Sequence, residues 1–572
     1  MEMSEEEKTS NDTDLASVPA GETGIIQELL TFSGKRILEK ILEQDNPQQW
    51  VRHIPQEDFF WLVKKVGHDD CSPLLKMASD DQKQYLLDLE FWEKDRLDLD
   101  KAAEWLGRLH MADPQGLVKW FQSKGEAIAY YYLFKGIQVE IRSEEEDQEF
   151  DESFFTFDSV FYVKILDEEH GKTIKNILRT IAADDLERYQ ALLSTLAGVI
   201  PVELEEDMYR LRNVRLAEHG FLPPEEALAV YAPLDPEALN VEEQAEPANT
   251  LFDEDIRELI PISPLYHARG RNILTKAFSG ISDNLLLDRI RLEFAGLCNQ
   301  IMSADGVLAN ELDVLIRACR KAAGHLNLAL ESICGADTSS AEKLLKNNPL
   351  ESVFRVGFGL VLELKWETER WLKDSWFHGM GLDFSFWGDA WGETLSGILE
   401  NKPRLSTGFE GDDEYKAFEY VSELDDCRIL VRRLKALDRM LEQLTEVYPL
   451  DKEMIEENQL TFRQALFNLW ARHLLNLEPG YSGISTDQVK AFFNHLRAGE
   501  EELPYKMPGV AETFTKDFMA YAPDIGPELK TNLQDVLSLI WQEFTEEYAW
   551  VAAKNLEGRY TKFLATDQEA RK

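Results

Sequence analysis

The apolar residues of this 572-residue chain recur mainly at helical spacing. In the second half they form two stripes in which apolar residues follow one another in steps of three or four. The first stripe is Leu287, Ile290, Phe294, Leu297 and Ile301, and the second is Leu430, Leu434, Leu437, Leu441, Leu444 and Tyr448. Such steps place the side chains on one face of an α-helix. The spacing therefore predicts long amphipathic helices packed in bundles.

Between residues 23 and 136 the apolar runs are shorter, and acidic or helix-capping residues precede them. Three such starts are Gln56–Asp58, His68–Asp70 and Ser79–Asp81. Acids and capping residues are favourable where a helix begins, because free backbone N–H groups point outward there. Helices this short need neighbours to be stable. We therefore predict a stack of short helices in this region.

A related pattern returns at residues 166–239. Ala78–Asp81 with Tyr85 has a counterpart in Ala182–Asp185 with Tyr189, and Asp113-Pro114 has one in Asp235-Pro236, in the same order. The recurrence is typical of a duplicated helical repeat. Capped helix starts also resemble one another without duplication, so both interpretations stay open.

Residues 137–165 have a different pattern. IQVEI at 137–141 alternates between apolar and polar residues, and FFTFDSVFYVKI at 154–165 is rich in aromatic and β-branched residues. The acidic run EEEDQEFDE at 144–152 separates them. Alternation and β-branched residues are signals of strands. We predict one small antiparallel β element with an exposed acidic loop.

Together these patterns predict an all-α, multi-domain protein with that single β element. Residues 1–22 are polar and acidic, which is typical of a disordered tail. Residues 240–264 are rich in acids and proline, which indicates a linker between two halves. The remaining parts are a helical repeat domain at 23–136, the β insertion at 137–165, a second helical block at 166–239, a helical domain with a Trp/Gly-rich loop at 265–405, and a C-terminal helical bundle at 406–572.

The net charge of −45, from 106 acidic and 61 basic residues, restricts the partners. A field of this sign repels phosphate backbones, so nucleic acid is not an expected partner. Other proteins are the expected partners, and a divalent cation remains an option. No sequence pattern indicates a cofactor, and the oligomeric state is left open.

The five cysteines are widely spaced and form no CxxC pair, which fits a reducing compartment. The N-terminus lacks the basic start and apolar stretch of a secretory signal. No apolar run reaches the roughly 18 residues of a membrane span. We therefore expect a cytoplasmic protein without a transmembrane helix.

Candidate metal ligands occur after the predicted helix that ends near residue 305. Asp305 precedes Gly306, and Glu311 and Asp313 follow. Carboxylate oxygens of this kind bind hard cations. Gly306 also fits a simpler role as a helix terminator. His68 and Cys71 have HxxC spacing, but no further pair follows at zinc-site spacing, so a helix start is the preferred interpretation.

Two further groups could bind a ligand or act as acids and bases. His267, Arg269 and Arg271 could clamp a carboxylate or phosphate, or simply pair with neighbouring acids. The segment WFHGMGLDFSFWGDAWG at 376–392 contains a possible acid–base pair. Its members would be His378 with Asp383 or Asp389. The alternative is that these aromatic residues fill a core.

The residues also resemble known families. FFWLVKKVGHDDCSPLLKMASDDQKQYLLDLEFW at 59–92 is similar to the helical N domain of MgtE-type magnesium transporters, which implies a superhelix of short helices and magnesium sensing. The other modules of those transporters have no counterpart here, and no ligand is carried over. GFLPPEEALAVYAPL at 220–234, RLEFAGLCNQIMSADG at 291–306 and VFRVGFGLVLELKWETERWL at 353–372 resemble a large uncharacterised bacterial family, a domain of unknown function of the DUF6178 type. That resemblance implies no activity.

Stacked helices present extended surfaces that typically bind other proteins. Neither HExxH nor GxSxG occurs in the chain. The leading hypothesis is thus a non-catalytic protein-interaction or regulatory scaffold. The alternatives are an enzyme or small-ligand binder with a site between the two halves, and a sensor of divalent cations.

Overall fold

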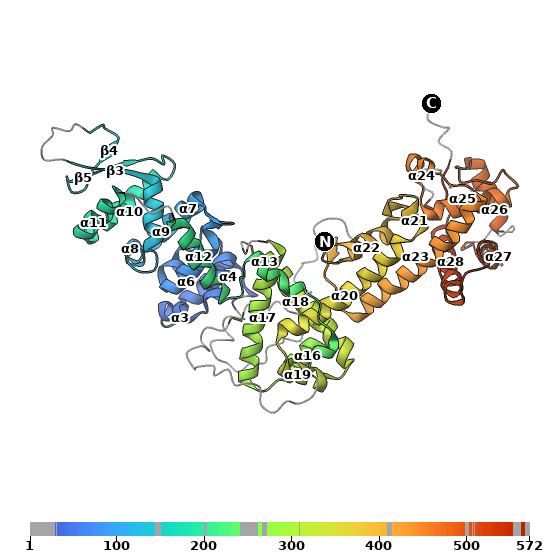
Figure 1. The fold of residues 1–572 in the computed structure, drawn as a ribbon, viewed down its shortest axis with the longest axis horizontal. Helices are drawn as coiled ribbons and strands as arrows, with labels where there is room; N and C mark the ends of the chain where they lie inside the picture. The colour runs from blue at the N-terminus through green and yellow to red at the C-terminus, as the bar shows by residue number, and fades with distance from the viewer. Residues whose placement is uncertain are drawn as a thin grey trace, which may run out of the picture. The chain divides into compact units, whose positions relative to one another are not determined.

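The computed structural model of the chain describes residues 29, 31–142, 150–198, 203–240, 261–262, 264–265, 271–307, 309, 311–408, 414–497, 503–505, 507, 510–552 and 562–566. The structure is predominantly α-helical, which confirms the predicted all-α class (Figure 1). The chain forms two compact units, unit 1 at Met1–Gly357 and unit 2 at Phe358–Lys572. The predicted tail at 1–22 lies outside the described residues.

The boundary between the units falls inside helix α20 (Leu350–Lys373). The linker predicted at 240–264 lies mostly outside the described residues, so it stays a prediction. Among the described residues, no helix combines the length and the apolar character that crossing a membrane requires.

Unit 1 begins with short helices, as predicted. They are α2 (Gly34–Leu42), α3 (Pro47–His53), α4 (Gln56–Val66), α5 (Ser72–Met77), α6 (Asp80–Glu90), α7 (Leu99–Ala112), α8 (Pro114–Phe121) and α9 (Glu126–Gly136). Each of the first helices contacts the next but one: α2 packs on α4, α3 on α5, α4 on α6 and α5 on α7. This arrangement buries apolar faces that no single short helix could hide from water.

Capping residues connect neighbouring helices of this stack. Ser79 and Gln82 form a capping box at the start of α6. The buried Gln82 side chain also donates hydrogen bonds of 2.7 Å to the carbonyl oxygens of Val51 and Ile54. One residue therefore satisfies backbone groups at both the start of α6 and the end of α3.

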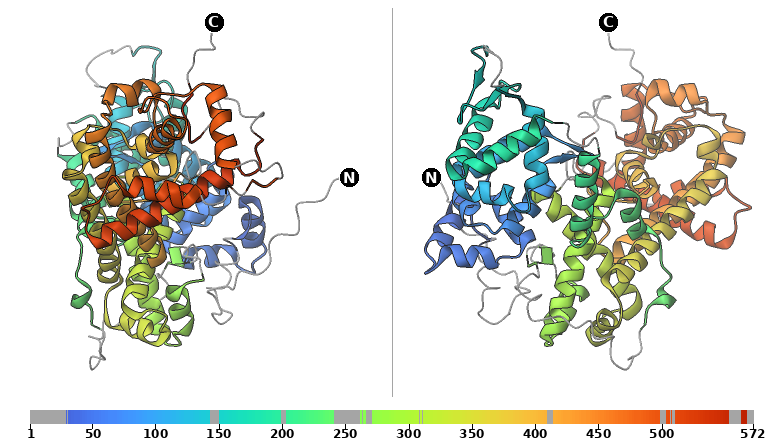
Figure 2. Two further views of the ribbon diagram at one scale, coloured as in Figure 1. Left: turned by 90° about the vertical axis from the view of Figure 1, so that its right-hand side faces the viewer. Right: turned by 60° about the vertical axis from the view of Figure 1, so that its left-hand side comes forward.

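The predicted β element is present and has three strands. They are β3 (Ile137–Ile141), β4 (Phe154–Phe155) and β5 (Phe161–Ile165), in the antiparallel order β3-β5-β4. Ile137 pairs with Ile165 across β3 and β5. The sheet contacts α9, α10 (Gly171–Asp184) and α11 (Leu186–Leu196), as Figure 2 shows. Residues 144–149 of the predicted acidic loop lie outside the described residues. A two-residue hairpin pair, β1 (Trp92–Glu93) and β2 (Arg96–Leu97), connects α6 to α7.

The two blocks that suggested a duplication start their helices differently. Ser79 caps α6, whereas its counterpart Ala183 lies inside α10, and Asp185 caps α11. Asp113 and Asp235 both cap a turn that begins with proline. The first of these turns opens the eight-residue helix α8, and the second opens a 3-10 turn of three residues, η2 (Pro236–Ala238). The duplication therefore stays a prediction.

Unit 1 continues with helices of 4 to 23 residues. The elements are α12 (Leu204–Ala217), α13 (Pro224–Ala227), η1 (Leu228–Tyr231), α16 (Ile273–Gly280), α17 (Asn284–Asp305), α18 (Leu312–Cys334) and α19 (Thr338–Asn347). The first predicted stripe lies on α17, where Ile290, Phe294 and Ile301 are buried. Gly306 ends α17 with a φ of +66°, a left-handed conformation that favours glycine. Helix α18 then packs on α4, which brings its first turn close to the short-helix stack.

Unit 2 is a helical bundle with a large aromatic core. Its elements are α21 (Trp376–Gly379), η3 (Phe384–Trp387), α22 (Asp389–Leu399), β6 (Leu405–Ser406), β7 (Tyr415–Lys416), α23 (Val421–Val447), α24 (Lys452–Asn458), α25 (Phe462–Leu474), α26 (Thr486–Arg497), α27 (Val510–Met519) and α28 (Pro527–Tyr548). The second predicted stripe lies on α23, with Leu434, Leu437, Leu441 and Leu444 buried. Helix α23 packs along α28, so the stripe is bundle core as predicted.

Candidate functional site

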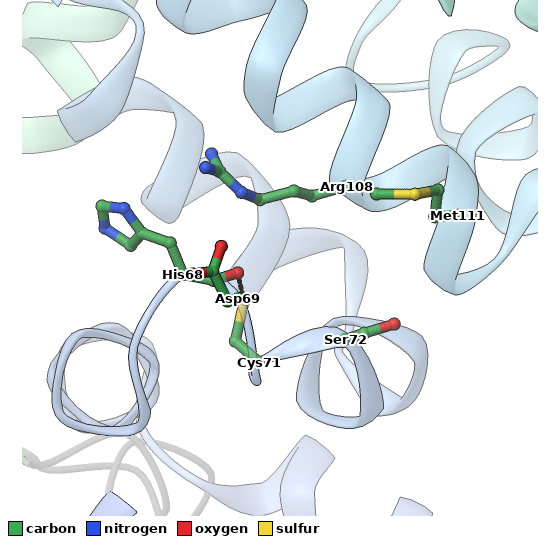
Figure 3. Close-up of a pocket in the computed structure, with 6 residues that line it drawn as sticks. All are labelled: His68, Asp69, Cys71, Ser72, Arg108 and Met111. Carbon is green, nitrogen blue, oxygen red and sulfur yellow. Dashed lines mark hydrogen bonds between the residues drawn. The ribbon is translucent and has the colours of Figure 1, made fainter.

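Unit 1 contains an open cleft of about 700 Å³ where α4, α6 and α7 meet the start of α18. We call it the acidic cleft; it is lined by Lys64, Gly67, His68, Glu90, Lys101, Glu104, Trp105, Glu311, Leu312 and Asp313. A smaller cavity of about 100 Å³, the side pocket, shares His68 with it. The side pocket is lined by His68, Asp69, Cys71, Ser72, Arg108 and Met111 (Figure 3).

A buried ion pair forms the floor of the acidic cleft. Lys64 of α4 pairs with Glu90 of α6, and their side chains are only 4% and 10% exposed. Trp105 Nε1 donates a 3.1 Å hydrogen bond to the second carboxylate oxygen of Glu90. A buried ion pair has to be compensated by such bonds, because desolvation of the two charges is costly. The charges of Lys64 and Glu90 are thus already satisfied inside the protein.

His68 lies beside this pair at the junction of the two cavities. Burial, together with the charge of Lys64, lowers the pKa of His68 below its ordinary value of 6.5, so the imidazole is neutral at pH 7. The Lys64 ammonium lies 3.5 Å from His68 Nε2. An ammonium group can only donate, so a hydrogen bond between these atoms requires an unprotonated Nε2 on His68. The ring also contacts Trp105 edge-on at a centroid distance of 5.2 Å.

Cys71 of the side pocket is a protonated thiol. Its Sγ donates a hydrogen bond of 3.3 Å to the carbonyl oxygen of His68, and Figure 3 shows the sulfur turned toward that oxygen. Burial raises the pKa of the Cys71 thiol to about 11. The thiolate, not the thiol, is the nucleophile and metal ligand. Helix α5 begins at Ser72, directly after Cys71, in line with the helix-start interpretation of the HxxC spacing.

The rim of the acidic cleft carries most of its negative charge. Glu311 occupies the N-cap position of α18 without a capping bond, and Asp313 lies in the first turn of that helix. Both are exposed, and within the described part of the chain neither forms an ion pair. Glu104 lies 3.3 Å from Arg108, whose guanidinium lies over the Trp105 ring.

The balance of charges in the acidic cleft is negative. Four carboxylates line it, whereas its only basic side chains are two lysines. Lys64 is paired with Glu90, and Lys101 lies 3.2 Å from Asp98. The cleft therefore attracts cationic groups, and its uncompensated charge is concentrated at the start of α18.

The three predicted metal ligands do not gather at one place. Glu311 and Asp313 lie at the rim of the acidic cleft, whereas Asp305 belongs to another cluster. Its carboxylate accepts hydrogen bonds from Tyr231 Oη at 2.7 Å and from Lys321 Nζ at 2.9 Å. Within the described ranges, no three His, Cys, Asp or Glu side chains are arranged to hold a metal ion. Metal binding by these residues stays a prediction.

The predicted acid–base residues of unit 2 all lie at its surface. His378, Asp383 and Asp389 are exposed. Asp383 caps η3 by accepting a 3.0 Å hydrogen bond from the backbone N–H of Ser385. Asp389 is the first residue of α22. Among the described contacts, none joins the His378 imidazole to either carboxylate.

The aromatic side chains around these residues are packed. We call Trp376–Gly392 the aromatic segment. Phe377, Phe386 and Trp387 are at most 3% exposed. Trp387 contacts Phe377 and Phe462 at centroid distances of 5.3 and 5.5 Å. This packing agrees with the alternative in which the aromatic residues fill a core.

Asp438 of α23 anchors the aromatic segment and was not predicted as a special residue. It is 6% exposed and accepts hydrogen bonds from the backbone N–H groups of Trp376 at 3.2 Å and Phe377 at 2.9 Å. Burial raises the pKa of Asp438 to about 6. The available signal was its position beside Leu434, Leu437 and Leu441 on the apolar face of the stripe.

The remaining predicted ligand residues fall largely outside the described part of the chain. His267 and Arg269 lie there, while Arg271 is described and lies just before the start of α16 at Ile273. Their proposed role in binding an anion stays a prediction. Lys64, Glu90, Glu104 and Trp105 of the acidic cleft were missed, because three charged residues and one tryptophan on three separate helices give no local signal.

Comparison with known proteins gives one result. No curated protein and no solved structure matches the chain. The resemblance of residues 59–92 to the MgtE N domain stays an expectation. A sequence model of one family matches residues 23–567, nearly the whole chain, and this protein therefore belongs to the family of unknown function DUF6178.

Proposed function

We propose that this protein is a cytoplasmic, non-catalytic interaction protein whose acidic cleft receives a basic segment of a partner protein. The observation that carries the proposal is the surplus of carboxylates in an open cleft whose two lysines are already paired. Glu311 and Asp313 are the groups that would meet lysine or arginine side chains of the partner.

Electrostatics sets the expected strength of such contacts. A charge pair at about 4 Å contributes roughly 1 kcal/mol in water and about 4 kcal/mol near a protein surface. The rim carboxylates are exposed, so their contribution lies toward the lower value and falls with salt. Attraction of this kind mainly guides the encounter and selects the charge of the partner.

The geometry favours binding over catalysis. The thiol of Cys71 is held protonated, and the Lys64 ammonium is held by Glu90 beside a neutral His68. A catalytic cysteine needs a lowered thiol pKa, whereas burial raises the pKa of Cys71. The volume of the cleft, about 700 Å³, suits several side chains of an extended segment.

The test uses the full-length protein and a fluorescein-labelled peptide of alternating lysine and glycine. Fluorescence anisotropy would measure its Kd at low and high salt. The double variant Glu311→Gln/Asp313→Asn should raise the Kd about tenfold at low salt, since two attractive charges are lost without a change of shape.

The matched control is Glu225→Gln/Glu226→Gln. It removes the same charge from exposed acids in the first turn of α13, also in unit 1. This control should change the Kd less than about twofold. If both double variants lost the same affinity for the peptide, net charge alone would explain the attraction, and the assignment of peptide binding to the cleft would be overturned. Absence of binding to wild-type protein would also overturn it.

The same variants separate a cation-sensing role from peptide binding. If magnesium raised the melting temperature beyond the effect of matched ionic strength, and the Glu311→Gln/Asp313→Asn variant lost that rise, the carboxylates would be assigned to a metal ion instead. If the cleft binds peptide instead, magnesium should change the melting temperatures of the wild-type protein and the variant equally.

A further inference from the structure

Two cysteine side chains meet inside the α17–α18 hairpin of unit 1. Cys298 lies on α17 and Cys319 on α18, and these two helices pack against each other (Figure 1). The Sγ atoms are 3.7 Å apart, with Cys298 donating a hydrogen bond to Cys319. Both residues are fully buried.

This pair differs from the other cysteines of the chain. Cys71 uses its thiol on the carbonyl oxygen of His68, and among the described contacts no other two cysteine sulfurs touch. A disulfide has an S–S length of about 2.05 Å, so closure requires the two sulfurs to approach by about 1.7 Å. Contact between α17 and α18 holds the two thiols facing each other while the hairpin is closed.

We propose that Cys298 and Cys319 are an oxidative modification site, at which hydrogen peroxide converts the dithiol to an intramolecular disulfide. One sulfur attacks peroxide as a thiolate; an S–O bond forms, the O–O bond breaks, and the departing oxygen leaves as water after protonation. The second sulfur attacks the resulting sulfenic acid; the S–S bond forms, the S–O bond breaks, and a second water leaves. Two thiols are oxidised by two electrons, and one peroxide is reduced.

Burial makes this reaction slow and selective. Burial and the neighbouring Cys319 raise the pKa of the Cys298 thiol, so little thiolate exists in the closed hairpin. Reaction therefore proceeds through brief opening of the helix pair. The product would connect α17 to α18, the helix whose N-cap residue is Glu311 and whose first turn contains Asp313. The inference does not depend on peptide binding by the acidic cleft.

The experiment treats the full-length, reduced protein with hydrogen peroxide, blocks the remaining thiols after denaturation and maps the peptides by mass spectrometry. Methionine oxidation at Met111, whose side chain is 77% exposed, serves as the internal measure of dose. We expect a disulfide between Cys298 and Cys319 that dithiothreitol reverses. Cys334, which is only half-buried, should form no disulfide.

Variants make the result specific. Cys298→Ala and Cys319→Ala should each abolish the new cross-link, whereas Cys427→Ala in unit 2 should leave it unchanged. Complete oxidation of Met111 with both Cys298 and Cys319 still free would overturn the proposal. A cross-link that instead joins another pair of cysteines would also overturn it. If an alanine variant fails to fold, the peptide map of the oxidised wild-type protein still tests the proposal by itself.

Discussion

The acidic cleft of unit 1 is open and lined by charged side chains, whereas the aromatic segment of unit 2 is closed by its own side chains. The cleft consists of common residues on α4, α6, α7 and α18. The aromatic segment is rich in Trp and Phe, and Trp387 at its centre has no exposed surface. A segment of unusual composition can therefore be part of a packed core and need not be a reaction site. The open cleft, in contrast, is made of common residues that distant segments of the chain bring together.

Truncation of Trp387 tests the filled character of the aromatic segment most strongly. Trp387→Ala should lower the free energy of unfolding of unit 2 by about 3–5 kcal/mol, because it leaves a cavity among Phe377, Phe386 and Phe462. Urea unfolding followed by near-ultraviolet circular dichroism would measure this loss. The exposed control Ser385→Ala should stay within about 0.5 kcal/mol. A loss below about 1 kcal/mol for Trp387→Ala would mean that the segment is not a core.

Removal of one partner from the cleft floor should have the next largest effect. Lys64→Met leaves the Glu90 carboxylate, which is 10% exposed, without its ammonium and should cost about 3 kcal/mol. Denaturant unfolding would measure the cost. Lys40→Met breaks the exposed pair with Glu43 and should change stability by less than about 1 kcal/mol. The double variant Lys64→Met/Glu90→Met should be more stable than Lys64→Met, because it no longer leaves an unpaired buried carboxylate. Equal stability of the single and double variants would contradict a buried pair.

Asp438 should give unit 2 a specific pH dependence. Its folded pKa of about 6 lies above its ordinary value of 3.8, so the folded state binds more protons between these values. The free energy of unfolding therefore falls as pH rises through this window, by up to about 3 kcal/mol. The measurement is urea unfolding of wild-type protein and Asp438→Asn at pH 4 and pH 7. The fall should be smaller in the variant, and parallel profiles would argue against a buried carboxyl at the start of α21.

The smallest effect is expected for the exposed histidine of the aromatic segment. His378→Ala should change the free energy of unfolding by no more than about 0.5 kcal/mol, since its side chain is exposed. Thermal and urea unfolding of the variant would check this value. A loss of more than about 1.5 kcal/mol in the free energy of unfolding would indicate a buried contact of the imidazole. It would then support an acid–base pair with Asp383 or Asp389.

Much of the fold was predictable from local patterns. The alternating segment at 137–141 and the β-branched segment at 154–165 became paired strands, because alternation places one face of each against α9–α11. The stripe on α23 became bundle core for the equivalent helical reason. The third strand, β4, was part of the predicted segment at 154–165, but its separation from β5 depends on a turn at residues 156–160 that periodicity does not reveal.

The candidate site was predictable only in fragments. Glu311 and Asp313 were selected as acids after a helix terminator, and they do lie at one cleft. Their neighbours there are Lys64, Glu90 and Glu104, more than two hundred residues earlier in the chain. A single sequence contains no record of which distant charges meet, so the cleft and its charge balance required the folded chain.

The helical class, the β element and the negative charge follow from residue types and short spacings alone. Three contacts became visible only in the folded chain: Lys64 pairs with Glu90, Asp438 binds the backbone of the aromatic segment, and Cys298 faces Cys319. The physical reason is that local periodicity fixes which face of a helix is apolar. Which helices then share that face depends on the packing of the whole unit.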